Sequence, residues 1–157
     1  EKKDKEHAAR RRILTFARSA DVVKLTDEEA EWLLGIDREM AMKEPSVVRA
    51  YFPEAKGVLV TAGECGASYD LLGSTGFIPP YDVDAVETTG AGDAFSAGFL
   101  FHVLQDKAPG GLLDHLAAVE EALQFASAVG ALTCTGEGAI AAQPTAEDVE
   151  ALMSGRG

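Results

Sequence analysis

The chain has 157 residues, 46% of them hydrophobic, which is enough for one domain with a substantial core. Its formal net charge of −12 argues against a surface for nucleic acid or for anionic membranes, because either would need a basic stripe. The two cysteines, Cys65 and Cys134, are far apart and no apolar run could cross a bilayer, so we expect a soluble intracellular protein with reduced thiols.

The first third of the chain is predicted to contain a helix, a strand and a second helix. Residues 1–20 have apolar side chains at helical spacing. Residues 21–25 are short, β-branched and apolar, which is typical of a buried strand. Thr26 and Glu29 fit the first and fourth positions of a capping box, which begins a helix that ends near Gly35.

The middle of the chain is predicted to contain a β-hairpin. Residues 57–61 read as a buried strand, and the turn with Gly63 and Gly66 leads into residues 68–72 as the returning strand. Residues 73–80 are predicted to be a loop, because they begin with Gly73 and end with two prolines.

A glycine-rich turn follows, with the sequence Val86-Glu87-Thr88-Thr89-Gly90-Ala91-Gly92-Asp93. It leads into an apolar helix that is predicted from Ala94 to about Leu104. Such a turn leaves several N–H groups unpaired at a helix N-terminus, where the helix dipole favours an anion such as phosphate. Asp93 would repel a resting phosphate, but it could accept a proton from a hydroxyl that attacks one. The alternative is that Asp93 only stabilises the first helical turn, by ~0.3–1 kcal/mol.

Two known phosphate-binding sequences do not fit this turn. The Walker A loop would need Lys-Ser/Thr after the glycines, and the dinucleotide fingerprint would need a third glycine where Phe95 stands.

The last third of the chain is predicted to be mainly helical. An alanine-rich helix runs from about Leu113 to Ala131, a glycine-rich turn covers residues 134–139, and Thr145 caps a last helix from Ala146 to Met153. The alternation of strands and helices predicts an α/β fold, a three-layer sandwich with a mainly parallel sheet.

The glycine-rich turn resembles the signature D-T-x-G-A-G-D-x-F of the PfkB (ribokinase-like) carbohydrate kinases. Three further segments resemble patterns of this family in the same order along the chain: Thr26–Glu29, Thr61–Gly66 and Gly138–Pro144. Plant-type fructokinases are the most similar branch. The resemblance implies that residues 1–157 are the C-terminal, nucleotide-binding part of a ribokinase-like domain, with the N-terminal sugar-binding half and lid absent.

The resemblance also implies an activity, the ATP-dependent transfer of the γ-phosphate to a hexose hydroxyl, most naturally of fructose. Asp93 would be the catalytic base, and the backbone of Gly90, Ala91, Gly92 and Asp93 would form an anion hole. Glu29 would act indirectly near Mg²⁺, and Glu87 near a monovalent cation, K⁺. The implied ATP-binding residues are Thr61, Gly63, Gly66, Thr133, Gly136, Gly138 and Ala139.

The resemblance leaves partners and compartment open: a sugar substrate, a homodimer or a larger assembly, in the cytoplasm or a plastid. Without the sugar-binding half, the chain alone is expected to be inactive. A second function also stays open, that of a catalytically silent, fructokinase-like structural subunit of an assembly such as a plastid transcription complex.

Two residues depart from the family pattern. Thr26 stands where the family has Asn, and Glu29 has a capping-box role as an alternative to the role near Mg²⁺, although one residue can serve both. Glu87 stands where the family usually has Asp, and its extra methylene displaces the carboxylate. The resulting hypothesis is that activation by potassium is weakened or lost.

Overall fold

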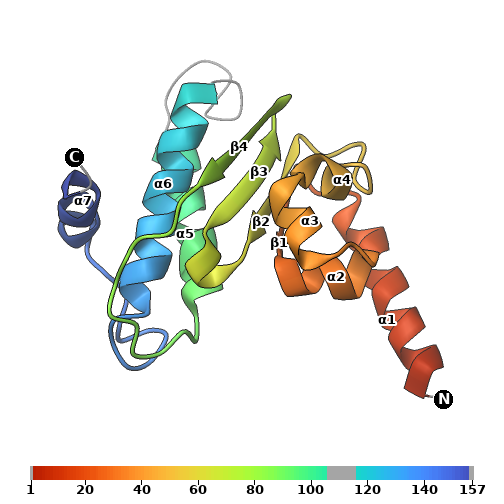
Figure 1. The fold of residues 1–157 in the computed structure, drawn as a ribbon, viewed down its shortest axis with the longest axis horizontal. Coiled ribbons are helices and arrows are strands. Elements are labelled where there is room, and N and C mark those ends of the chain that lie inside the picture. The colour runs from red at the N-terminus through yellow and green to blue at the C-terminus, as the bar shows by residue number, and fades with distance from the viewer. Residues whose placement is uncertain (1, 106–115, 156–157) are drawn as a thin grey trace. The chain divides into compact units, whose positions relative to one another are not determined.

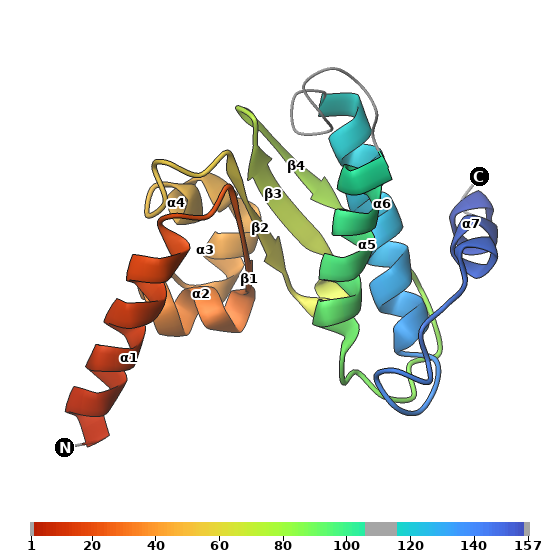
Figure 2. The ribbon, with the colours of Figure 1, turned by 180° about the vertical axis from the view of Figure 1, so that it is seen from behind.

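The computed structural model describes residues 2–105 and 116–155, which form two compact units (Figures 1 and 2). The first takes its described residues from Glu1–Ala62 and Ala67–Phe77, and the second from Gly63–Gly66 and Ile78–Gly157. The elements run in the order α1 (Lys2–Ala17), β1 (Val22–Thr26), α2 (Asp27–Leu34), α3 (Arg38–Lys43), α4 (Pro45–Arg49), β2 (Gly57–Thr61), the 3₁₀ turn Gly63–Cys65, β3 (Ala67–Leu71), β4 (Ser74–Ile78), α5 (Ala91–Gln105), α6 (Leu116–Thr133) and α7 (Ala146–Ser154).

The sheet has the strand order β1-β2-β3-β4. Strands β1 and β2 are parallel, with Val23 opposite Val58, whereas β2 and β3 are antiparallel, with Val60 opposite Ser68. The predicted α/β class is confirmed, and so is the hairpin of β2 and β3. The strand directions need a correction, because the described sheet is mixed rather than mainly parallel. The turn after β2 is too short for a crossover, so it can join β3 to β2 only in the antiparallel direction.

Strand β4 corrects the loop predicted at residues 73–80. Leu72 and Gly73 both have positive φ, 54° and 79°, as a two-residue hairpin turn requires. The strand was missed because Gly76 has a low strand propensity. In the structure the ring of Tyr69 fills the space above Gly76, since a Cβ there would lie 2.6 Å from Tyr69 Cε1.

Helix α2 begins as the sequence predicts. The N–H of Glu29 donates to Thr26 Oγ1 at 3.0 Å, and the N–H of Thr26 donates to Glu29 Oε2 at 2.8 Å. Gly35 ends the helix with a φ of 73°. Helices α2, α3 and α4 pack on the strands of the first unit, and its buried core consists of Val23, Leu25, Ala30, Leu33, Leu34, Ala41, Val48, Phe52, Ala55, Val58 and Val60.

In the second unit, α5 and α6 lie side by side (Figures 1 and 2). Gly98 allows this close approach, because a Cβ there would lie 3.1 Å from the Cα of Ala126. Helix α5 begins at Ala91, within the predicted turn, and the predicted start of α6 lies outside the described residues. Helix α7 begins after Thr145 as predicted. The core of this unit contains Tyr81, Ala94, Phe125, Ala128, Val129 and Val149.

Over residues 2–105 and 116–155, no helix has both the length and the apolar character needed to cross a bilayer.

Candidate functional site

Two loops of the second unit, the one that leads into α5 and the one that follows α6, are joined by main-chain hydrogen bonds. The carbonyl oxygen of Cys134 accepts the N–H groups of Val86 at 2.7 Å and of Glu87 at 3.1 Å. The start of the glycine-rich turn is thereby held against the end of α6. A carbonyl acceptor has no sequence signature, so residue types could not have predicted this role of Cys134.

Gly90 is the point where the turn passes into α5. Its φ is 84°, and a Cβ at this position would lie 2.5 Å from the Cβ of Ala139. Both observations require glycine here. The carbonyl of Gly90 accepts the N–H of Ala94 at 2.8 Å, which is the first hydrogen bond of the helix. The predicted glycine-rich turn into a helix N-terminus is therefore present.

The first turn of α5 has N–H groups that the helix itself cannot satisfy. The N–H of Ala91 donates to the Thr88 carbonyl at 3.2 Å, across the turn. The N–H groups of Gly92 and Asp93 have no backbone acceptor in the described part of the chain. With the partial positive charge of the helix end, these two groups can bind an anion such as phosphate. The four-residue anion hole stays a prediction, with its strongest support at Gly92 and Asp93.

Asp93 lies in the same helical turn, and its side chain is exposed. Within residues 2–105 and 116–155, its carboxylate has no hydrogen-bond or ion-pair partner. An accessible, unpaired carboxylate can accept a proton from a bound hydroxyl. Its position is also the one expected if it only stabilises the helix start, so the catalytic role stays a prediction.

The carboxylate of Glu87 connects the loop that leads into α5 with the loop that follows α6. Its Oε2 accepts the N–H of Gly138 at 2.9 Å. The bond from Gly138, and next a hydrogen bond with the Thr89 side chain, lower the pKa of Glu87, because both favour the ionised form. Thr89 is a site residue that the sequence reasoning missed, although it lies within the quoted signature. The predicted contact of Glu87 with a monovalent cation stays a prediction.

Two other predicted ATP-binding residues lie in or next to the loop that follows α6. Thr133 is 1% exposed, and its hydroxyl donates to the Val129 carbonyl at 2.8 Å within α6. Its side chain therefore contributes packing rather than an exposed donor. Gly136 lies close to Ala142, since a Cβ at Gly136 would be 3.0 Å from the Cβ of Ala142.

The structure thus brings together part of the predicted site at one end of the α5 and α6 pair, where α5 begins and α6 ends (Figure 1). The residues gathered there are Glu87, Gly90, Ala91, Gly92, Asp93, Gly138 and Ala139.

The other predicted site residues lie around α2 and the turn between β2 and β3. Glu29 and Thr61 belong to the first unit, and the carboxylate of Glu29 is used in the capping box of α2. Gly63 and Gly66 have φ values of 53° and 87°, and the N–H of Gly66 donates to the Gly63 carbonyl at 3.0 Å. Turn geometry therefore accounts for both glycines, and the contacts of all four residues with nucleotide or magnesium stay predictions.

The acidic residues that the structure describes do not form a metal site of their own. In the described ranges, no group of three or more His, Cys, Asp or Glu side chains is arranged so that it could hold a metal ion. Mg²⁺ commonly keeps several waters and binds one or two carboxylates together with substrate phosphates. Binding of a magnesium ion together with a nucleotide therefore stays a prediction.

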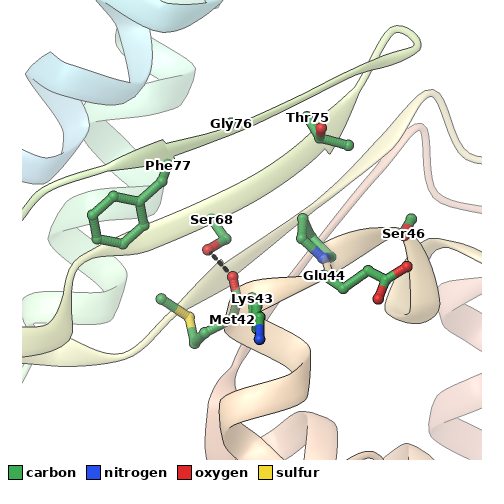
Figure 3. Close-up of a pocket in the computed structure, with 9 residues that line it drawn as sticks. Met42, Lys43, Glu44, Ser46, Ser68, Thr75, Gly76 and Phe77 are labelled. Atoms are coloured by element: carbon green, nitrogen blue, oxygen red, sulfur yellow. Dashed lines mark hydrogen bonds between the residues drawn. The ribbon is translucent and has the colours of Figure 1, made fainter.

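The first unit contains a pocket of about 430 Å³ (Figure 3). The hydroxyl of Ser68 donates to the carbonyl of Met42 at its wall. None of the predicted site residues is among the described residues that line it, which are Met42, Lys43, Glu44, Pro45, Ser46, Ser68, Thr75, Gly76 and Phe77.

Comparison with known proteins identifies the family of this chain. Residues 2–146 match the pfkB family of carbohydrate kinases. The chain belongs to the pfkB family. Fructokinase-1 of Oryza sativa subsp. japonica is 41% identical to it over 145 residues, which make up 92% of this chain and 43% of that relative.

Solved structures of fructokinases have the same fold over the matched part. A fructokinase of Xylella fastidiosa with bound ATP matches 94% of this chain and 46% of its own, with 27% identity and a TM-score of 0.78. A double mutant of the Vibrio cholerae fructokinase, with fructose, ADP and potassium ion bound, matches 91% of this chain and 44% of its own, with 27% identity and a TM-score of 0.77. The ribokinase-like α/β fold and the similarity to plant fructokinases are thereby confirmed. The chain spans less than half the length of each of these three proteins.

Proposed function

We propose that this chain is the nucleotide side of a sugar kinase, a fructokinase that transfers the γ-phosphate of ATP to a hydroxyl of fructose. The observation that carries the proposal is the exposed carboxylate of Asp93, which lies beside the N–H groups of Gly92 and Asp93; among the described residues, neither the carboxylate nor these N–H groups have a hydrogen-bond partner. The similar solved structures, a fructokinase with ATP and another with fructose and ADP, support it. The proposal concerns the whole protein, because the residues that contact the sugar are expected outside this chain.

The proposed reaction uses the Asp93 carboxylate and the N–H groups of Gly92 and Asp93 in one step. Asp93 accepts the proton of the sugar hydroxyl while the hydroxyl oxygen forms a bond to the γ-phosphorus. The bond from that phosphorus to the bridging oxygen breaks, and ADP leaves. The N–H groups of Gly92 and Asp93, with the helix dipole, stabilise the negative charge on the group in transfer. Magnesium, when bound with the nucleotide, would neutralise charge on the β- and γ-phosphates.

The substitution Asp93→Asn tests the base in the full protein that contains this chain. Asparagine keeps the size of the side chain and the backbone N–H, but it cannot take a proton. We expect kcat to fall by ~10²–10⁴-fold, with the KM for ATP little changed. Steady-state assays with ATP and fructose measure both quantities.

The matched control is Asp84→Asn, which removes an exposed carboxylate from the segment before α5 and should leave kcat unchanged. Unchanged turnover in Asp93→Asn would refute the assignment of the base. A parent protein that binds ATP but phosphorylates no sugar would refute the enzymatic proposal and favour the silent structural subunit.

A further inference from the structure

We infer that Glu87 is a positioning residue, which holds the loop that follows α6 against the loop that leads into α5 and so fixes the Gly90 turn in front of Asp93. The inference deepens the proposed function and rests on it. The two loops meet at the hydrogen bonds to the Cys134 carbonyl, at the bond from Gly138 to Glu87, and where Gly90 meets Ala139. Of these hydrogen bonds, the one from Gly138 is accepted by a side chain, so a substitution of Glu87 removes it, together with the bond between the Glu87 carboxylate and the Thr89 side chain, and leaves the two bonds to the Cys134 carbonyl in place.

A short path of contacts connects Glu87 with the reacting groups. Gly138 and Ala139 are neighbours in the chain, so the bond that fixes the N–H of Gly138 also fixes the place where Ala139 meets Gly90. Gly90 accepts the first hydrogen bond of α5 and directly precedes the helix. Loss of the Glu87 bond therefore allows the first turn of α5, with Asp93, to move.

The length of the side chain decides whether the bond can form. Oε2 of Glu87 is 2.9 Å from the nitrogen of Gly138. Aspartate is shorter by one carbon–carbon bond, roughly 1.5 Å, and its carboxylate falls short of Gly138. Glutamine keeps the length and offers a carbonyl oxygen as acceptor, without the charge. The variants Glu87→Asp and Glu87→Gln thus separate reach from charge.

The test compares the parent with Glu87→Ala, Glu87→Asp and Glu87→Gln in the full protein that contains this chain. Hydrogen exchange of the Gly138 amide, followed by NMR, reports on the hydrogen bond and needs no turnover. Glu87→Ala and Glu87→Asp should speed this exchange by roughly tenfold. They should lower kcat by up to about 10²-fold, with a smaller effect on the KM for ATP, because a small displacement of the reacting groups slows the chemical step.

Glu87→Gln should remain closer to the parent in both measurements, and this rescue would not be expected if only the charge mattered. The control is Glu137→Ala, which removes an exposed carboxylate from the same loop and should change neither. An unchanged exchange rate of the Gly138 amide in Glu87→Ala would show that the hydrogen bond to Glu87 does not protect it, and would overturn the inference whether or not the protein is active. Faster exchange with unchanged kcat, where Asp93→Asn is inactive, would overturn the positioning role alone. Full activity in Asp93→Asn would instead overturn the proposed function. The exchange rate of the Gly138 amide would then still test the hydrogen bond between Gly138 and Glu87.

Discussion

At the scale of single residues, the hydrogen bonds of Asp148 make its contribution to stability depend on pH. Its Oδ2 accepts the hydroxyl of Thr145 at 2.6 Å and the N–H of Thr145 at 2.9 Å. These bonds, the one from the hydroxyl first, lower the pKa of Asp148 below its ordinary value of 3.8. The ionised carboxylate is therefore favoured in the folded chain. Its stabilising contribution is present above the unfolded pKa and is lost as the pH falls through the folded pKa.

We therefore predict that the difference in stability between the parent and Asp148→Asn is largest near neutral pH and shrinks below about pH 4. Urea unfolding of both proteins at a series of pH values measures this difference. The control is Glu147→Gln, which removes a neighbouring first-turn carboxylate but keeps both bonds to Thr145, so this variant should retain the pH dependence of the parent. A difference between parent and Asp148→Asn that is constant with pH would contradict the prediction.

At the scale of elements, the hairpin of β3 and β4 depends on a glycine beneath an aromatic ring. A Cβ at Gly76 would lie 2.6 Å from Cε1 of Tyr69, so a larger residue must displace the ring. We predict that Gly76→Val lowers the free energy of unfolding by about 1–3 kcal/mol, as overpacking commonly does. Chemical denaturation measures the change.

The neighbouring Thr75→Val is the control for that substitution. Thr75 is exposed in the same strand, and its replacement should change the stability by no more than about 0.5 kcal/mol. Gly76→Val should also cost less in a Tyr69→Ala background, because the ring is then absent. An equal cost in both backgrounds would show that the ring is not the cause.

At the scale of the whole molecule, each of the two units has its own core. Phe52 is fully buried in the first core. We predict that Phe52→Ala costs about 3–5 kcal/mol and lowers the amide protection of β1 and β2 more than that of α5 and α6. Hydrogen exchange followed by mass spectrometry resolves the two regions. The control is Phe16→Ala, since Phe16 is 81% exposed, and equal losses in both regions would contradict separate cores.

The features that the sequence predicted correctly are those that depend on contacts between residues only a few positions apart in the chain. Thr26 with Glu29, and Thr145 before α7, begin helices through bonds that span three positions, so the residue types suffice to locate them. The turn at Gly90 was found in the same way, because the need for glycine and the free N–H groups at a helix start are local properties. Asp93 was singled out for its place in that turn.

What the sequence by itself determined is therefore the α/β class, the starts of α2 and α7, and the glycine-rich turn that places Asp93 at the start of a helix. The tertiary structure alone decided the mixed direction of the sheet, the strand around Gly76 and the bond between Glu87 and Gly138. Gly76 belongs to a strand because the ring of Tyr69 covers it, and Glu87 meets a residue 51 positions away. Such contacts depend on where the chain returns in space, and the residue types at either end do not contain that information.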